Sequence, residues 1–263
     1  MPVDLTMLVE DLEAETAELR RVLVSLDERG WKTPTPAPGW RVQEQVAHLA
    51  YFDEAATTAA TDADQFQREL DEAVRDADGI TERISRRSRA MQPAEVFAWF
   101  DSARRTMIET MLSLDPSARV PWYGPPMSVA SSLTARIMET WAHGQDVFDA
   151  LGIIHPPSRA LRQVSHLGVQ TFTNSFVSHG LDVPDVSVFV DLTGPDGSVW
   201  TWGDPTSDER ISGYALDFAL VVTQRRHLDD TNLRIHGPVG AEWMSIAQAF
   251  AGPPGEGRSP TKP

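Results

Sequence analysis

The chain has 263 residues, of which 38 are acidic and 23 are basic, so its formal net charge is −15. A charge of this sign opposes simple electrostatic binding to nucleic acids or anionic membranes, which are themselves polyanions. There are no cysteines, which excludes disulfides, a cysteine nucleophile and a thiolate metal site. Any metal ion would have to be held by histidine, aspartate or glutamate.

Apolar residues recur at three- and four-residue steps in four segments of the first half, which predicts four long helices. These helices are expected at 4–29, at 42–60, after Pro93 in AEVFAWFDSARRTMIETMLSL, and at 128–152. The intervening stretch 61–93 is charge-rich, and we interpret it as one or two exposed helical pieces with a solvated face. A four-helix bundle is the simplest way to bury four apolar stripes, so we expect a helical-bundle domain at residues 1–153.

The second half mixes helix and strand signals, which predicts a smaller α+β domain at residues 154–252. SVFVDLTGPDGSVWTWGD has two runs rich in β-branched and aromatic residues around a Pro-Asp-Gly turn, a pattern typical of a β-hairpin. The composition of residues 253–263 indicates a disordered tail. In chain order the predicted elements are a helix at 157–179, the hairpin at 187–204, a helix at 207–230, a strand in NLRIHG and a helix at 241–252.

Two of the seven histidines follow a glutamate by four residues in a predicted helix, namely His48 after Glu44 and His143 after Glu139. Residues at this spacing project from one face of a helix, so Glu139 and His143 can face His48 across the bundle. Glu44 lies in the polar first turn of its helix, where we expect it to be solvated. A His/Glu/His set would suffice for a borderline ion such as zinc with positions left open. The spacing alone also allows a core histidine bonded to a backbone carbonyl, or a surface Glu/His pair.

A resemblance to a known family favours the metal site. TPAPGWRVQEQVAHLAYFDE and ARIMETWAHGQDVFDALG resemble the two signatures of the DinB-like, mycothiol-dependent maleylpyruvate isomerase metal-binding domain. The resemblance covers about residues 5–152 and implies that His48, Glu139 and His143 bind a divalent metal, zinc first and nickel as the alternative. It also implies mycothiol as a thiol cofactor or co-substrate. Asp146 is either an orienting partner of a ligand imidazole or an exposed helix residue.

The second half resembles, in its general pattern, the α+β domain that follows the bundle in many actinobacterial members. In the chemistry that the family implies, a metal-bound thiol loses its proton and adds to an electrophilic double bond. Expulsion of the thiol after bond rotation gives isomerisation, and retention of the sulfur gives S-transfer. Arg225 and Arg226 are candidate anchors for a substrate carboxylate. The alternative is a basic cluster at a helix C-terminus that interacts with the helix dipole and with Asp229 and Asp230.

Three functional hypotheses therefore stand side by side. The first is a metal- and mycothiol-dependent isomerase or S-transferase that acts on a small electrophile, and the second is a hydrolase that uses metal-bound water. The third is a non-enzymatic small-ligand-binding protein with a structural metal. The expected partners are a small-molecule substrate and a thiol, without nucleic acid or membrane. The first residues lack the character of a signal peptide, so we expect a cytoplasmic location, and the oligomeric state stays open.

Overall fold

The computed structural model describes residues 4–75 and 79–261. The chain divides into two compact units, Met1–His155 and Pro156–Pro263. The first unit is helical and the second combines helices with a four-stranded sheet, which confirms the expected α+β class. Within the described residues, no helix combines the length and the apolar character needed to cross a lipid bilayer.

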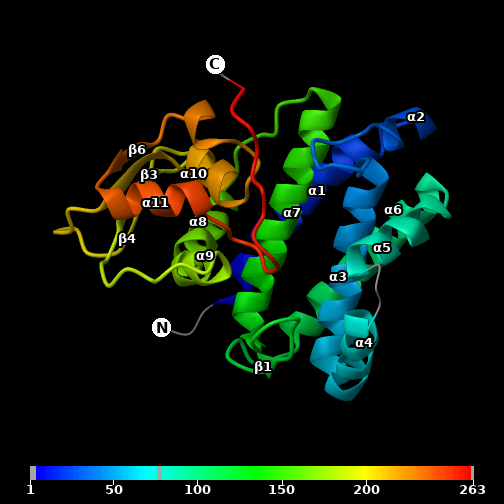
Figure 1. Cartoon of the computed structure of the whole chain (residues 1–263). Coiled ribbons are helices and arrows are strands. Elements are labelled where there is room, and N and C mark those ends of the chain that lie inside the picture. Colours follow the sequence, from blue (N-terminus) through cyan, green and yellow to red (C-terminus); the bar gives the residue numbers. More distant parts are fainter. Residues whose placement is uncertain (1–3, 76–78, 262–263) are drawn as a thin grey trace. The chain divides into compact units, whose positions relative to one another are not determined.

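Four long helices form the first unit, namely α1 (Leu5–Leu23), α3 (Val42–Thr61), α6 (Pro93–Leu112) and α7 (Val129–Leu151). Helix α3 packs against α6 and α7, and α1 packs against α7, as Figure 1 shows. The shorter elements are α2 (Glu28–Trp31), α4 (Ala63–Arg75), α5 (Gly79–Arg89) and an antiparallel pair of two-residue strands, β1 (Arg119–Val120) and β2 (Met127–Ser128). The predicted bundle is therefore confirmed.

Local sequence signals fix the ends of these helices. Pro93 opens α6 because a proline at the first helical position has no amide that needs a partner. The hydroxyl of Ser128 accepts a hydrogen bond from the backbone of Ser131 at the start of α7. Gly152 ends α7 with a φ of 64°, a backbone conformation that glycine adopts readily. The single helix predicted over 4–29 is wrong beyond Leu23, because a turn separates α1 from α2.

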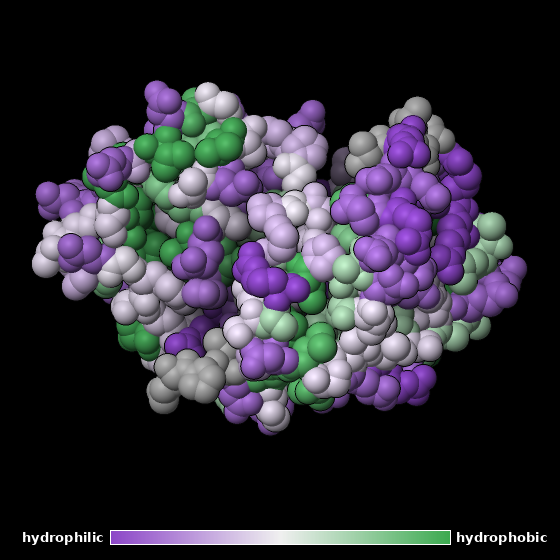
Figure 2. Space-filling model, turned by 90° about the horizontal axis from the view of Figure 1, so that it is seen from below, coloured by the Kyte–Doolittle hydropathy of each residue, from purple (hydrophilic) through white to green (hydrophobic). Residues whose placement is uncertain are grey.

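The charge-rich segment between α3 and α6 folds into the exposed helices α4 and α5, as predicted. Phe66 of α4 is buried, with ring contacts to Trp122 and Tyr123, whereas the charged residues of α4 are largely exposed. Figure 2 shows strongly hydrophilic side chains gathered on the right of the molecule, on the side where Figure 1 places α4. The charged side chains of α4 therefore face solvent, and the helix is held to the rest of the unit by the buried ring of Phe66.

The second unit contains a sheet of order β4-β3-β5-β6, in which β3 pairs parallel with β5 and the other neighbours are antiparallel. Its strands are β3 (Phe189–Thr193), β4 (Val199–Trp202), β5 (Arg210–Tyr214) and β6 (Arg234–His236). Its helices are α8 (Leu161–Gln170), α9 (Phe172–Ser178), α10 (Ala215–Val222), the 3-10 turn η1 (Leu228–Asp230) and α11 (Pro238–Ile246). The predicted hairpin is confirmed as β3 and β4, and the predicted strand in NLRIHG as β6.

The helix predicted over 207–230 is wrong in its first part. Residues Arg210–Tyr214 form β5, which pairs with β3 on one side and β6 on the other, and its Ile211 is buried. Pairing on both edges satisfies the backbone of β5, so tertiary context outweighs the local pattern. Only Ala215–Val222 is α-helical.

Two further helix predictions need correction in the second unit. The helix predicted over 157–179 is divided at Thr171, whose hydroxyl bonds to the carbonyls of Leu167 and Gly168. The last helix begins at Pro238 and ends at Ile246, earlier at both ends than predicted.

Residues 253–261 form no helix or strand in the structure. The amide of Gly255 donates to the side-chain oxygen of Gln248 over 2.9 Å. The amide of Thr261 donates to the carboxylate of Asp230 over 2.9 Å. The tail thus has hydrogen bonds to other residues of the second unit.

Candidate metal centre

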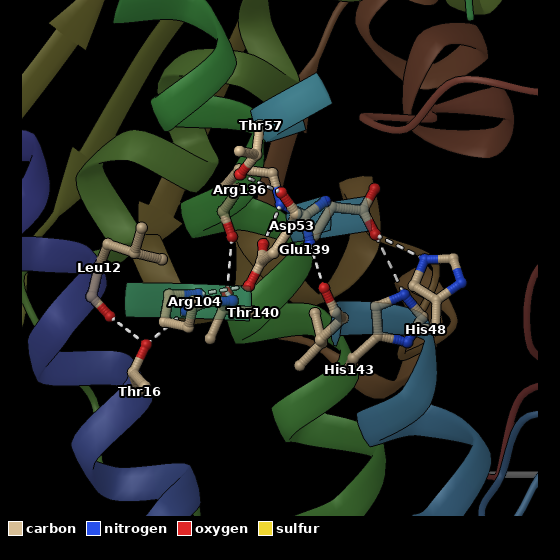
Figure 3. Close-up of polar contacts among 11 residues, drawn as sticks. Leu12, Thr16, His48, Asp53, Thr57, Arg104, Arg136, Glu139, Thr140 and His143 are labelled. Carbon is tan, nitrogen blue, oxygen red and sulfur yellow. Dashed lines mark hydrogen bonds and ion pairs between the residues drawn. The ribbon is translucent and has the colours of Figure 1, made fainter. Parts of the chain in front are cut away.

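Helices α3 and α7 bring together the three residues that the sequence singles out. His48 projects from α3, and Glu139 and His143 project from successive turns of α7, as Figure 3 shows. The Oε2 atom of Glu139 lies 3.1 Å from Nε2 of His143 and 3.4 Å from Nε2 of His48. All three side chains are largely buried, with exposed fractions of 16% for His48, 20% for Glu139 and 12% for His143.

The spacing of these atoms suits a small divalent ion. Each residue offers one ligand atom, and the three atoms lie within 4.8 Å of one another. Ligands placed about 2.0–2.1 Å from a tetrahedral zinc ion lie roughly 3.3 Å apart, close to the two measured distances. Two imidazoles and one carboxylate also match the ligand types that zinc and nickel accept.

Gln45 determines which nitrogen of His143 faces Glu139. Its Oε1 lies 2.5 Å from Nδ1 of His143, and its amide nitrogen donates to Thr35 Oγ1 over 2.9 Å. An amide oxygen only accepts, so the proton of a neutral His143 is assigned to Nδ1. The Nε2 lone pair then faces the carboxylate oxygen of Glu139. Two acceptors 3.1 Å apart repel unless His143 carries a second proton or a cation lies between them.

Burial and nearby charge control protonation at His48 and Glu139. Burial lowers the pKa of His48 to about 4, with the charge of His143 as a second cause, and hydrogen bonding to Glu139 only partly offsets this. Burial acting alone would raise the pKa of Glu139, but the interactions of its carboxylate with His143 and His48 outweigh burial and hold that pKa well below its usual value. A neutral imidazole and an ionised carboxylate are the forms that bind a metal.

The two histidines differ in their outer partners. Nδ1 of His48 is buried and has no hydrogen-bond partner among the described residues, whereas Nδ1 of His143 bonds to Gln45. The rings of Phe52 and Trp40 lie 4.6 Å and 5.3 Å from the His48 ring, centroid to centroid. Trp40 also stacks on His143, with an interplanar angle of 16°. These aromatic walls restrict water around the imidazoles.

Asp146 and Glu44 occupy different positions around the centre. The carboxylate of Asp146 is buried and lies 3.4 Å from the amide nitrogen of Gln45, so it reaches His143 through Gln45. Glu44 was expected to be solvated, and this is wrong because its side chain is fully buried. Its carboxylate accepts hydrogen bonds from the guanidinium groups of Arg41 over 2.8 Å and Arg89 over 3.0 Å. It also accepts from the backbone amide of Arg41 and so caps the start of α3. Glu44 is therefore a structural residue of the helix start.

Arg225 and Arg226 lie in the second unit, on the turn that follows α10. Their guanidinium groups donate to backbone carbonyls, Arg225 to Thr223 over 2.6 Å and Arg226 to Arg225 over 2.7 Å.

The residue before Arg225, Gln224, has a φ of 58° and is the one non-glycine with positive φ among residues 4–75 and 79–261. A left-handed residue here reverses the chain, so that the Arg225 amide bonds to the carbonyl of Leu220.

Sequence reasoning did not identify Gln45 as part of this centre. A usable signal was its spacing, because residues three apart on a helix lie on one face and Gln45 is one turn before His48. A buried amide beside a predicted imidazole ligand is a candidate outer partner.

Comparisons with known proteins identify the family of the chain. The family described as "Mycothiol maleylpyruvate isomerase N-terminal domain" matches residues 12–148. Two proteins of Mycobacterium tuberculosis, from strains CDC 1551 / Oshkosh and H37Rv and both described as uncharacterised, are each 41% identical over 250 residues. These alignments cover 95% of this chain and 97% of the relative.

Two solved structures share the fold at 16% sequence identity. A crystal structure of mycothiol-dependent maleylpyruvate isomerase aligns with a TM-score of 0.58 over 85% of this chain and 90% of that chain. A histidine-to-alanine variant of mycothiol-dependent maleylpyruvate isomerase aligns with a TM-score of 0.60 over 86% of this chain and 91% of that chain. Together with the match over residues 12–148, these findings mean that the chain belongs to the mycothiol maleylpyruvate isomerase N-terminal domain family.

Proposed function

We propose that this protein is a divalent-metal-dependent enzyme that uses mycothiol to isomerise a small electrophilic substrate or to transfer sulfur to it. The observation that carries the proposal is the approach of two histidine nitrogens to one carboxylate oxygen, at 3.4 Å and 3.1 Å. A cation at this point would relieve the repulsion between acceptors, and zinc fits the donor set, with nickel as the alternative. The structural neighbours, which are mycothiol-dependent maleylpyruvate isomerases, support mycothiol as the thiol.

The composition indicates which chemical groups the protein supplies and which the thiol supplies. The chain has no cysteine, so a sulfur nucleophile must come from outside. When bound, the metal would supply Lewis-acid activation that lowers the pKa of a coordinated thiol. Glu139 supplies one negative charge and His48 and His143 supply neutral donors, while Gln45 keeps the His143 ring oriented. Trp40 and Phe52 line the imidazoles and limit competition from water.

The chemical step is an addition followed by an elimination. The thiolate forms a carbon–sulfur bond to an electron-poor double bond, and the displaced electron pair moves onto the conjugated carbonyl. Rotation about the new single bond and expulsion of the thiolate give the geometric isomer without net oxidation. Protonation of the carbanion with the sulfur retained gives S-transfer instead.

Substrates of this kind that carry carboxylates need a cationic anchor. We assign Arg225 and Arg226 as candidates, because a guanidinium group binds a carboxylate through two parallel hydrogen bonds. Their present bonds to backbone carbonyls orient the side chains. Asp146 acts one step from His143, by holding the amide of Gln45.

Elemental analysis of the purified protein tests the metal assignment. We expect near-stoichiometric divalent metal in the wild type and little in His48→Ala or His143→Ala, with His236→Ala as the control because that histidine is exposed on β6. Equal trace metal in all four proteins, persisting after reconstitution with zinc and nickel, would refute the centre.

Substrate consumption with and without mycothiol separates the functional alternatives. Turnover of maleylpyruvate or a related electrophile only with the thiol supports the proposed isomerase or S-transferase. Turnover without thiol supports a metal-dependent hydrolase. Bound metal with no turnover of either kind supports a non-enzymatic ligand-binding protein with a structural metal.

A further inference from the structure

A buried ionic network lies beside the candidate metal centre. Asp53 of α3 accepts from Nε of Arg104 over 2.6 Å and from Nε of Arg136 over 2.9 Å. The exposed fractions of the three side chains are 0%, 1% and 2%, respectively. Figure 3 shows this set, here called the arginine–aspartate network, next to Glu139 and the two histidines.

Further hydrogen bonds extend the network to all four long helices of the first unit. Arg104 on α6 donates to the hydroxyl of Thr16 on α1 and, over 3.0 Å, to the hydroxyl of Thr140 on α7. The Thr140 hydroxyl in turn donates to the carbonyl of Arg136 over 2.7 Å. The network therefore cross-links α1, α3, α6 and α7 through directional contacts.

The network is anchored beside the candidate ligands in sequence as well as in space. Asp53 lies on the same helix as His48, and the carbonyl of Leu49, the residue after His48, is 3.5 Å from Nη2 of Arg136. Arg136 and Thr140 bracket Glu139 on α7. A shift of α3 against α7 would thus strain the network and, at the same time, change the distances between His48 and the two ligands on α7.

Stability alone is a weak explanation for these residues. The network buries two guanidinium groups and one carboxylate, so it carries one excess positive charge, and removing charges from water is costly. Apolar side chains of similar volume are often as stabilising in such places. What apolar packing does not provide is directional geometry, because a guanidinium group has donors in a fixed planar fork. A metal site needs its first ligands held within about 0.5 Å.

We propose that Asp53, Arg104 and Arg136 are positioning residues that set the separation of the helix bearing His48 from the helix bearing Glu139 and His143. The inference rests on the proposed function, since it concerns the geometry of the same metal centre. None of the hydrogen bonds of Asp53, Arg104 and Arg136 goes to one of the three candidate ligands. The network fixes the two helices from which the ligands project.

The decisive comparison uses an apolar replacement of the whole network in the full-length chain. The metal-free proteins are titrated with zinc against a chromogenic chelator, and cobalt(II) absorption reports the coordination geometry. Urea unfolding gives the stability of each protein. The variants are Asp53→Leu/Arg104→Met/Arg136→Met together, Arg136→Met alone and Arg136→Lys alone, with Leu19→Ala as the control.

The expected result separates geometry from stability. The triple variant and Arg136→Met should bind zinc about 10–100-fold more weakly, as do changes to outer partners of metal ligands, with an altered cobalt spectrum. Arg136→Lys should resemble Arg136→Met, because lysine keeps the charge but lacks the fork. Leu19 is a buried core residue of α1, so Leu19→Ala should lose stability and keep the affinity and the spectrum of the wild type.

Two results would overturn the proposal. One is a triple variant that folds and binds zinc with the affinity and spectrum of the wild type. Where the triple variant does not fold, Arg136→Met with wild-type affinity and spectrum has the same force. The other is full recovery of affinity in Arg136→Lys, which would make charge the cause. A wild-type chain that binds no zinc would instead refute the proposed function, so the two failures are distinguishable.

Discussion

The amide oxygen of Gln45 on α3 lies 2.5 Å from Nδ1 of His143 on α7. This contact joins two helices and fixes the His143 ring, because the other end of the amide is held by Thr35 and Asp146. It leaves Nε2 of His143 toward Glu139 and His48. The outer partner of one candidate ligand thus comes from the helix that supplies another.

Replacement of Gln45 by leucine should weaken metal binding about 10–100-fold, because the His143 ring loses the acceptor that orients it. The affinity is measured by zinc titration against a chelator. Gln43→Leu is a matched control, since Gln43 is also a buried glutamine of α3 but donates to the carbonyls of Ser88 and Met91. Equal affinities in the two variants would contradict the role of Gln45.

Asp146→Asn should weaken zinc binding less than Gln45→Leu does. Asp146 reaches His143 through the Gln45 amide, at 3.4 Å, and asparagine keeps an oxygen that can accept from that amide. The same chelator competition measures the difference. A loss in Asp146→Asn as large as that in Gln45→Leu would mean that Asp146 acts directly on a ligand.

Glu44→Gln should destabilise the first unit by about 1–3 kcal/mol at pH 7, because a buried charge-assisted contact with Arg41 and Arg89 is weakened. Burial alone would raise the pKa of Glu44, but hydrogen bonds from Arg41 and Arg89 outweigh it and lower that pKa below 4.5. A carboxylate whose pKa is lower in the folded state than in the unfolded state stabilises the fold at pH values above its unfolded-state pKa. This stabilisation is lost as the pH falls through the folded-state pKa.

The difference between wild type and Glu44→Gln in free energy of unfolding should therefore be largest near neutral pH. It should shrink as the pH falls below about 4. Urea unfolding at several pH values measures it, with Glu54→Gln as the control, because the Glu54 carboxylate is 48% exposed. A difference in free energy of unfolding that grows on acidification would contradict a lowered pKa of Glu44 in the folded protein.

His155→Ala should cost about 2–4 kcal/mol of stability without changing the metal content. The imidazole is buried, with contacts of 3.1 Å to both Glu15 and Gln145, and it stacks on Phe148 at 4.3 Å. Thermal or urea unfolding and elemental analysis together test this. Loss of metal in His155→Ala, with the fold retained, would place this histidine in the functional centre.

Arg225→Ala and Arg226→Ala should raise KM for a carboxylate-bearing substrate, because the substrate loses a bidentate partner. Metal content should stay at the wild-type level. Steady-state kinetics with and without the substrate carboxylate, for instance with its amide analogue, separates anchoring from structural damage. An equal rise in KM for the carboxylate substrate and its amide analogue would contradict the anchoring role and favour a basic cluster at the end of a helix.

Much of the first unit follows from the sequence, because long apolar repeats predict helices well. The candidate ligands also follow, since Glu139 and His143 lie one turn apart and the family signatures mark His48. The arginine–aspartate network shows a signal that was available but unused. Arg136 lies between Leu133 and Ile137 on the buried stripe of α7, where a charged residue requires a partner.

Other features depended on contacts that local patterns do not contain. Strand β5 has no alternation of its own strong enough to distinguish it from a helix, and its identity comes from β3 and β6 on either side. Glu44 is in a helical first turn, which is usually exposed, yet Arg89 from α5 covers it. Both cases require knowledge of which segments meet in three dimensions.

His48 and Glu139 are 91 positions apart in the chain although their side chains meet. During synthesis at about 5–20 residues per second, the α3 segment emerges roughly 5–20 s before its partner on α7. No nascent chain that stops short of α7 contains the complete ligand set, so an ion held by this set can enter only when the first unit is finished. Occupancy of the centre would then mark the completed bundle.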